Sequence, residues 1–136
     1  MNRRRFIRNI SLISAGFLFI TEKIQGKEPP VFSEYKPDPS LWKEDEINIA
    51  WIGHSTVLIN FFGTTILTDP VFYERIGVSI FGMTFGPSRF TYPALTIDEI
   101  PKPDIILLSH AHMDHMDYES LDTITKTFPD QIDCIT

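Results

Sequence analysis

The segment Asp104-Ile105-Ile106-Leu107-Leu108 constrains the fold of this chain more than any other stretch. Its apolar residues follow one another without polar alternation, which is typical of a β-strand buried on both faces. A helix is predicted soon after it, because Asp117 can cap a helix and Leu121, Ile124 and Phe128 follow at helical spacing. A buried strand followed by an amphipathic helix predicts an α/β protein.

Further strands are predicted on both sides of this segment. Alternating or β-branched apolar residues mark them at 47–51, 57–61, 64–68 and 132–135. Gly63 separates the second of these strands from the third, so the two are predicted to form a hairpin. The stretch 70–95 shows no sustained periodicity but holds six aromatic residues, which predicts a long ordered loop with a function.

Residues 1–26 differ from the rest of the chain. Arginines at 3–5 and at Arg8 precede an apolar stretch at 10–20, which is too short for a bilayer core that needs about 20 helical residues. This layout predicts an export signal, and residues 3–8 resemble the twin-arginine motif. We therefore expect a protein that is exported to the periplasm or anchored to a membrane through this segment. The alternative is a basic amphipathic helix that lies on a membrane.

The remainder of the chain is acidic. Residues 27–45 hold four prolines and are predicted to be an extended linker or arm. From Lys27 onward there are 7 basic and 17 acidic residues, a formal charge of −10, which argues against binding nucleic acid through a basic patch. The single cysteine, Cys134, excludes an internal disulfide and a zinc site built from cysteines.

Three of the four histidines lie in the segment SHAHMDHMD, residues 109–117, directly after the apolar strand. Side chains two residues apart in an extended segment point the same way, so His110 and His112 can meet on one ion. Asp114 and His115 can face a second ion if the chain turns there. Imidazole and carboxylate ligands suit zinc, with iron or manganese as alternatives. The other interpretations are a surface loop rich in histidine, a buried structural histidine, or the first strand of an amidohydrolase barrel.

The order His110-Ala111-His112-Met113-Asp114-His115 is similar to the HxHxDH signature of metallo-β-lactamase-fold hydrolases. The segments 51–57, 67–72, 86–90 and 106–110 resemble the branch of N-acyl phosphatidylethanolamine-hydrolysing phospholipase D, and the L-ascorbate-6-phosphate lactonase group shares part of this pattern. The resemblance implies an αββα sandwich, of which residues 46–136 would form the N-terminal part, roughly one half.

The resemblance also implies roles for the residues of the motif. His110 and His112 would bind the first of two divalent metal ions, and Asp114 and His115 the second, with Asp114 also assigned to catalysis. Asp69 would orient a ligand histidine from behind the metals. The alternative for Asp69 is a turn before proline.

Three residues are expected at the substrate, and one more histidine at the rim of the site. Phe81 and Phe85 belong to an aromatic loop that would form an apolar wall for an acyl or lipid-like group, and Arg89 would meet a phosphate. His54 matches a family histidine near the metals. The alternatives are a satellite hydrophobic cluster, a surface salt bridge for Arg89, and a histidine that merely ends a strand.

The implied activity is metal-dependent hydrolysis, in which a metal-bound hydroxide attacks the phosphorus of a small or lipid-like phosphodiester, as in phospholipase D, or a lactone carbonyl. The family's site also needs two further histidines and a bridging carboxylate after this motif, whereas the chain has no histidine beyond His115. We therefore expect an incomplete site. The alternatives are a truncated, non-catalytic remnant that binds metal weakly, and a membrane-associated interaction module. The oligomeric state is left open.

Overall fold

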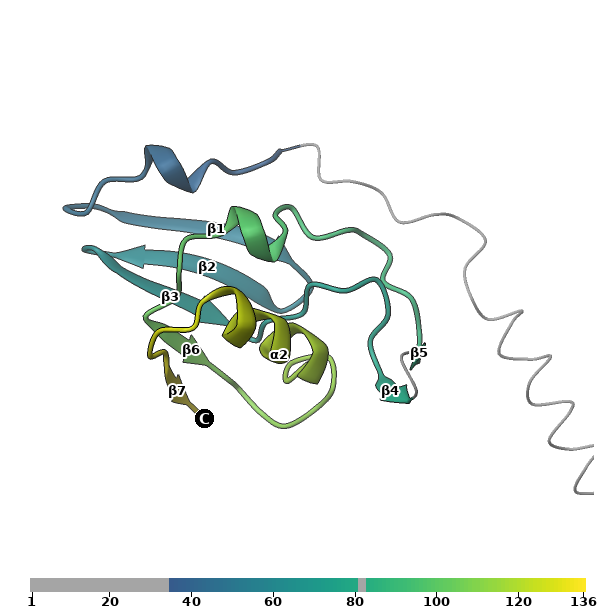
Figure 1. Cartoon of the computed structure of the whole chain (residues 1–136). Helices are drawn as coiled ribbons and strands as arrows, with labels where there is room; N and C mark the ends of the chain where they lie inside the picture. Colours follow the sequence, from purple (N-terminus) through teal and green to yellow (C-terminus); the bar gives the residue numbers. More distant parts are fainter. Residues whose placement is uncertain (1–34, 81–82) are drawn as a thin grey trace, which may run out of the picture.

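The computed structural model describes residues 35–80 and 83–136, which form a mixed β-sheet with a helix over one face (Figure 1). The elements are η1 (Pro39–Leu41), β1 (Ile47–Gly53), β2 (Thr56–Phe61), β3 (Thr64–Thr68), β4 (Val78–Ile80), β5 (Met83–Phe85), η2 (Ile97–Glu99), β6 (Ile105–Leu107), α2 (Tyr118–Thr127) and β7 (Asp133–Ile135). The strands at 47–51, 57–61, 64–68 and 104–108 and the helix after them are present as predicted, and the prediction of an α/β protein is confirmed.

The main sheet has five strands in the order β1-β2-β3-β6-β7. Strands β1, β2 and β3 form an antiparallel meander, whereas β6 is parallel to β3 and β7 is parallel to β6. The parallel pairing explains why residues after β3 and residues after β6 meet, because the carboxyl ends of parallel strands lie at the same edge of a sheet.

One face of the sheet, here called the closed face, carries the hydrophobic core. Ile52, Leu58, Leu67 and Ile106 point toward this core, and each is almost fully buried. Helix α2 contacts η2, and both lie over this face (Figure 1). Ile124 of α2 is fully buried in the same core. The periodicity that predicted the helix therefore marks the side that covers the sheet.

The opposite face, here called the open face, is apolar but only partly buried. Its side chains come from the alternate strand positions, which the register aligns across the sheet as Ile49, Ile59, Ile66 and Ile105. Ile49 remains 67% exposed and Trp51 64% exposed. The strand at 104–108 was predicted to be buried on both faces, but Ile105 and Leu107 on the open face are only half-buried.

The connection from β3 to β6 contains a feature that the sequence did not predict. Strands β4 and β5 form an antiparallel hairpin inside the segment predicted as an aperiodic loop. Gly77 and Gly86 close the base of this hairpin. A Cβ on Gly77 would collide with the carbonyl oxygen of Phe85, and a Cβ on Gly86 with that of Ile76. The missed signal was this pair of glycines, since close backbone approach excludes a side chain.

The predicted export signal, residues 1–26, lies outside the described residues and stays a prediction, as do residues 27–34 of the predicted arm. Residues 35–45 of the arm are described and contain the short helix η1. Within the described part of the chain, the helices are too short and too polar to cross a membrane.

Candidate metal centre

The histidine segment leaves the end of β6 and folds back on itself. The amide of Leu108, the residue directly before the segment, donates to the carbonyl of Ile135 and so holds the end of β6 beside β7. The amides of His115 and Met116 both donate to the carbonyl of His112, so the chain makes a tight turn there. The turn that the two-ion prediction required is therefore present.

The turn brings three imidazole rings together. The ring centroids of His110 and His112 lie 4.5 Å apart, and those of His110 and His115 lie 4.1 Å apart. His110 and His112 are exposed, whereas His115 is partly buried. A pair of adjacent, accessible imidazoles is the arrangement expected if His110 and His112 share an ion. Their assignment to the first metal stays a prediction.

Asp69 lies behind His115, as the resemblance implied. Its carboxylate Oδ2 is 2.8 Å from His115 Nδ1, and its Oδ1 accepts the backbone amide of Ser109 at 2.7 Å. Burial alone would raise the pKa of Asp69, but hydrogen bonds from His115 and Ser109 outweigh burial and hold this pKa below its ordinary value. An ionised carboxylate only accepts hydrogen bonds, so His115 donates from Nδ1 and keeps the lone pair of Nε2 free for a metal ion.

The backbone of Asp69 is specialised for this position. Its φ of 36° lies in the left-handed region, which is uncommon for residues other than glycine, asparagine and aspartate. Its amide donates to the carbonyl of Leu107, and its carbonyl accepts the hydroxyl of the buried Thr56. These bonds fix the direction in which the carboxylate points, so Asp69 does more than end a strand before proline.

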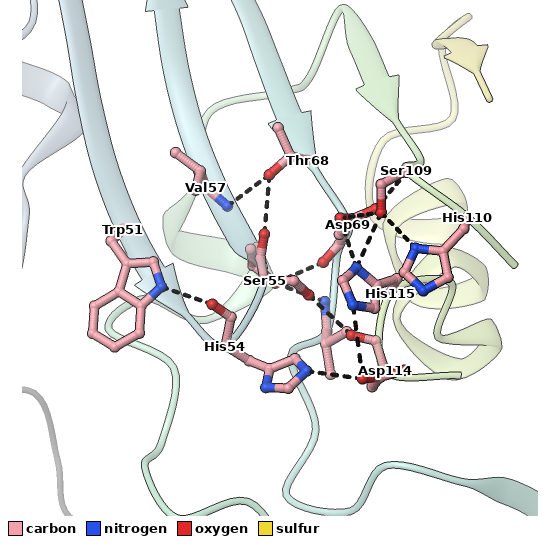
Figure 2. Close-up of polar contacts among 12 residues, drawn as sticks. Trp51, His54, Ser55, Val57, Thr68, Asp69, Ser109, His110, Asp114 and His115 are labelled. Atoms are coloured by element: carbon pink, nitrogen blue, oxygen red, sulfur yellow. Dashed lines mark hydrogen bonds and ion pairs between the residues drawn. The ribbon is translucent and has the colours of Figure 1, made fainter. Parts of the chain in front are cut away.

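Three possible metal ligands form a cluster, called the candidate metal centre below: His54, Asp114 and His115. One donor atom from each lies within 4.8 Å of the other two. His54 Nε2 is 3.4 Å from Asp114 Oδ2, and His115 Nε2 is 3.7 Å from the same oxygen (Figure 2). Burial would raise the pKa of Asp114, but hydrogen bonds, including one from His54, and the charges of His115 and His54 lower it. Nitrogen and carboxylate donors at these separations fit a zinc, iron or manganese ion.

His54 reaches the centre because of the turn between β1 and β2. Its φ of 53° is left-handed, and its carbonyl accepts a hydrogen bond from Trp51 Nε1 at 2.8 Å. The neighbouring Ser55 donates its hydroxyl to the carbonyl of Asp114 at 2.9 Å, which links this turn to the histidine segment (Figure 2). The sequence placed His54 only near the rim, whereas the structure brings it within reach of a shared ion.

A cavity of about 570 Å³ opens beside the candidate metal centre. Its lining residues are Trp51, His54, Ile76, Pro87, Ser88, Arg89, Phe90, Thr91, Met113 and Asp114. Most of this surface is apolar, and His54 and Asp114 of the candidate metal centre are among its polar lining residues. Cavities of this size and composition are typical of small-molecule sites.

The structure describes two of the three predicted substrate residues, Phe85 and Arg89. Phe81 lies outside the described residues, and Phe85 is exposed but does not line the cavity. Arg89 contributes to the cavity wall, but its guanidinium is buried and donates to the carbonyl of Val71. Burial lowers the pKa of Arg89, and the charge of Asp117 partly offsets this effect. Contact between Arg89 and a phosphate stays a prediction.

Residues 48–133 match the sequence family described as the beta-lactamase superfamily domain. The match covers more than half of the chain, and the chain belongs to this superfamily. The metallo-β-lactamase-type fold predicted from the HxHxDH signature is thereby confirmed. Of this fold, the described residues supply the five-stranded mixed sheet, the β4–β5 pair and the helix α2.

Similar proteins include two phospholipases. The chain is 34% identical over 86 residues to N-acyl-phosphatidylethanolamine-hydrolyzing phospholipase D 1 of Caenorhabditis elegans, covering 63% of this chain and 23% of that protein. It is 46% identical over 72 residues to the mitochondrial N-acyl-phosphatidylethanolamine-hydrolyzing phospholipase D of Saccharomyces cerevisiae, covering 53% of this chain and 14% of that protein. It is 37% identical over 70 residues to a metal-dependent hydrolase of Haloquadratum walsbyi, covering 52% of this chain and 23% of that protein. The chain thus spans less than a quarter of the length of these relatives.

Proposed function

We propose that this chain supplies part of the active site of a metal-dependent hydrolase that acts on a lipid-like phosphodiester, as in a phospholipase D-type reaction. The observation that carries this proposal is the clustering of donor atoms from His54, Asp114 and His115, two of which also line a largely apolar cavity. The similarity to two phospholipases and a metal-dependent hydrolase supports it.

Two divalent ions, zinc in the first instance, fit the donor set best in this proposal. His110 and His112 would hold one ion, and Asp114 and His115 the other, with His54 close to the second. Bound there, such ions would act as Lewis acids and lower the pKa of a water molecule. The exposed positions of His110 and His112 leave this side open to substrate.

The chain's own residues would orient the reaction. Asp69 holds the ring of His115 through Nδ1, so that Nε2 faces Asp114. Trp51, Phe90 and Met113 would contact the apolar part of the substrate, while its phosphodiester would lie toward His54 and Asp114. A largely apolar wall that also includes possible metal ligands suits a substrate with both an apolar and a charged part.

Zinc titration of the full chain tests the proposal, with Asp114→Asn as the variant and Asp130→Asn as a matched control at an exposed site. We expect the original chain and the control to bind zinc, and Asp114→Asn to bind it at least about tenfold more weakly, since a charged ligand is lost. Calorimetry measures the affinity, and release of nitrophenol from a phosphodiester measures turnover. Unchanged zinc affinity in Asp114→Asn would contradict the assigned centre. Zinc binding without turnover would favour the alternative of a non-catalytic remnant.

A further inference from the structure

One hydroxyl group touches the ligands expected for both ions. Ser109 Oγ lies 2.8 Å from Asp69 Oδ2, 2.9 Å from His110 Nδ1 and 3.1 Å from His115 Nδ1 (Figure 2). The backbone amide of Ser109 is bound to the other carboxylate oxygen of Asp69. The serine is therefore fixed by both its main chain and its side chain, at the point where the two histidines approach each other.

The protons available on Ser109, on Asp69 and on the two histidine rings determine the direction of each hydrogen bond. A serine hydroxyl has one proton to donate and two lone pairs to accept with, and an ionised carboxylate has none to donate. The short contact between Ser109 Oγ and Asp69 Oδ2 therefore uses the serine proton. The contact between Ser109 Oγ and His110 Nδ1 then needs its proton from the ring, so His110 carries its hydrogen on Nδ1.

The same reasoning applies to His115. Its Nδ1 faces Asp69 Oδ2 at 2.8 Å and Ser109 Oγ at 3.1 Å, and neither oxygen has a free proton to offer. His115 Nδ1 is therefore protonated as well, mainly toward the carboxylate. In both rings the unprotonated nitrogen is Nε2, which is the only ring atom left to bind a metal ion.

We infer that Ser109 is a positioning residue that, together with Asp69, fixes His110 and His115 in the tautomer that binds metal through Nε2. The inference rests on the proposed function for its purpose, because His110 and His115 are assigned there to different ions. A single hydroxyl would then link the ligand sets of both ions. The sequence motif alone does not reveal this role, since the signature begins one residue later.

The test uses the full chain without metal, at about pH 8, where an unperturbed imidazole is neutral. Long-range proton–nitrogen NMR spectra show which nitrogen of each ring carries the hydrogen. The variants are Ser109→Ala, Ser109→Thr, which keeps a hydroxyl at this exposed position, and the distant control Ser40→Ala. We expect His110 and His115 to carry hydrogen on Nδ1 in the original chain, in Ser109→Thr and in Ser40→Ala.

In Ser109→Ala we expect His110 to lose its preference for Nδ1, because its acceptor is gone. His115 should keep most of its preference, because Asp69 remains its partner. Zinc affinity should fall about tenfold or more in Ser109→Ala and by much less in Ser109→Thr, since supporting hydrogen bonds to metal ligands have effects of this size. Thermal unfolding followed by circular dichroism identifies any variant that fails to fold.

The inference is overturned if His110 carries its hydrogen on Nε2 in the original chain. It is also overturned if Ser109→Ala leaves the His110 tautomer unchanged, or if a folded Ser109→Thr variant behaves like Ser109→Ala. Expected tautomers in a chain that binds no zinc would support the role of Ser109 in setting the rings. The lack of zinc binding would separately contradict the proposed metal-dependent function.

Discussion

The two faces of the five-stranded sheet are built from the same strands but have opposite surroundings. On the closed face, Leu58 and Leu67 are completely buried in the core that also contains Ile97 of η2 and Ile124 of α2. On the open face, Ile49 and Trp51 of the adjacent strand remain mostly exposed. Apolar residues occupy both faces, so residue type does not separate them. The difference lies in which segments pack above each face.

The superfamily fold offers a reason for an apolar open face. The sandwich implied by that fold packs two sheets face to face, and such packing requires apolar residues on the inner side of each sheet. The chain spans less than a quarter of the length of its similar phospholipases. The comparison shows that strand periodicity indicates which faces carry apolar side chains suited to burial. Whether those side chains are buried depends on the segments that pack above them.

The largest expected effect is on the closed face. We expect Leu58→Ala to lower the free energy of unfolding by about 2–5 kcal/mol, because it removes buried methyl groups and leaves a cavity. The matched change Ile49→Ala, on the open face, should cost less than about 1 kcal/mol, since the side chain is already exposed. Urea unfolding measures both. Equal losses of unfolding free energy in the two variants would show that the two faces do not differ in burial.

A smaller effect is expected at the helix that covers the closed face. Asp117 caps α2, with Oδ2 accepting the amide of Ser120 at 3.0 Å and its hydroxyl at 2.6 Å. We expect Asp117→Ala to cost about 1–2 kcal/mol of unfolding free energy, through loss of the cap. Thr125→Ala, at an exposed position of the same helix, serves as the control and should change stability by less than about 0.5 kcal/mol. A loss in the control as large as in Asp117→Ala would show that the cap is not the cause.

The smallest effect on stability is expected for a charge placed on the open face. Ile49→Lys should change the unfolding free energy by less than about 0.5 kcal/mol, because the lysine ammonium can stay in water. The substitution should also reduce self-association of the protein, because a contiguous exposed apolar surface promotes association. Urea unfolding and light scattering check the two expectations. A loss of stability comparable to that of Leu58→Ala would mean that this face is covered in solution.

Local patterns were sufficient to predict much of the fold. The meander, the strand at 104–108 and the Asp117 cap each depend on residues close in sequence, where periodicity and capping act directly. The β4–β5 hairpin was missed because its strands are three residues each, too short to show alternation. The incomplete burial of β6 was missed because a continuous apolar run does not show whether both faces are covered.

The candidate site was predictable in its ligand types but not in its contacts. The HxHxDH spacing and the aspartate before proline predicted that His110, His115 and Asp69 belong to one site, and the structure places His115 close to both of the others. Their roles at a metal ion stay predictions. The approach of His54 to Asp114 depends on a left-handed turn between distant elements. The role inferred for Ser109 depends on three contacts that no spacing rule describes.

The parallel pairing of β3 with β6 also has a consequence for the order of folding. The β1–β2–β3 meander needs only short loops, so it can form early and locally. Asp69 reaches Ser109 and His115 only after the long segment between β3 and β6 has closed, which carries a larger loop-closure entropy. The candidate ligands would therefore reach their final geometry late, and an ion bound to them would act mainly by slowing unfolding.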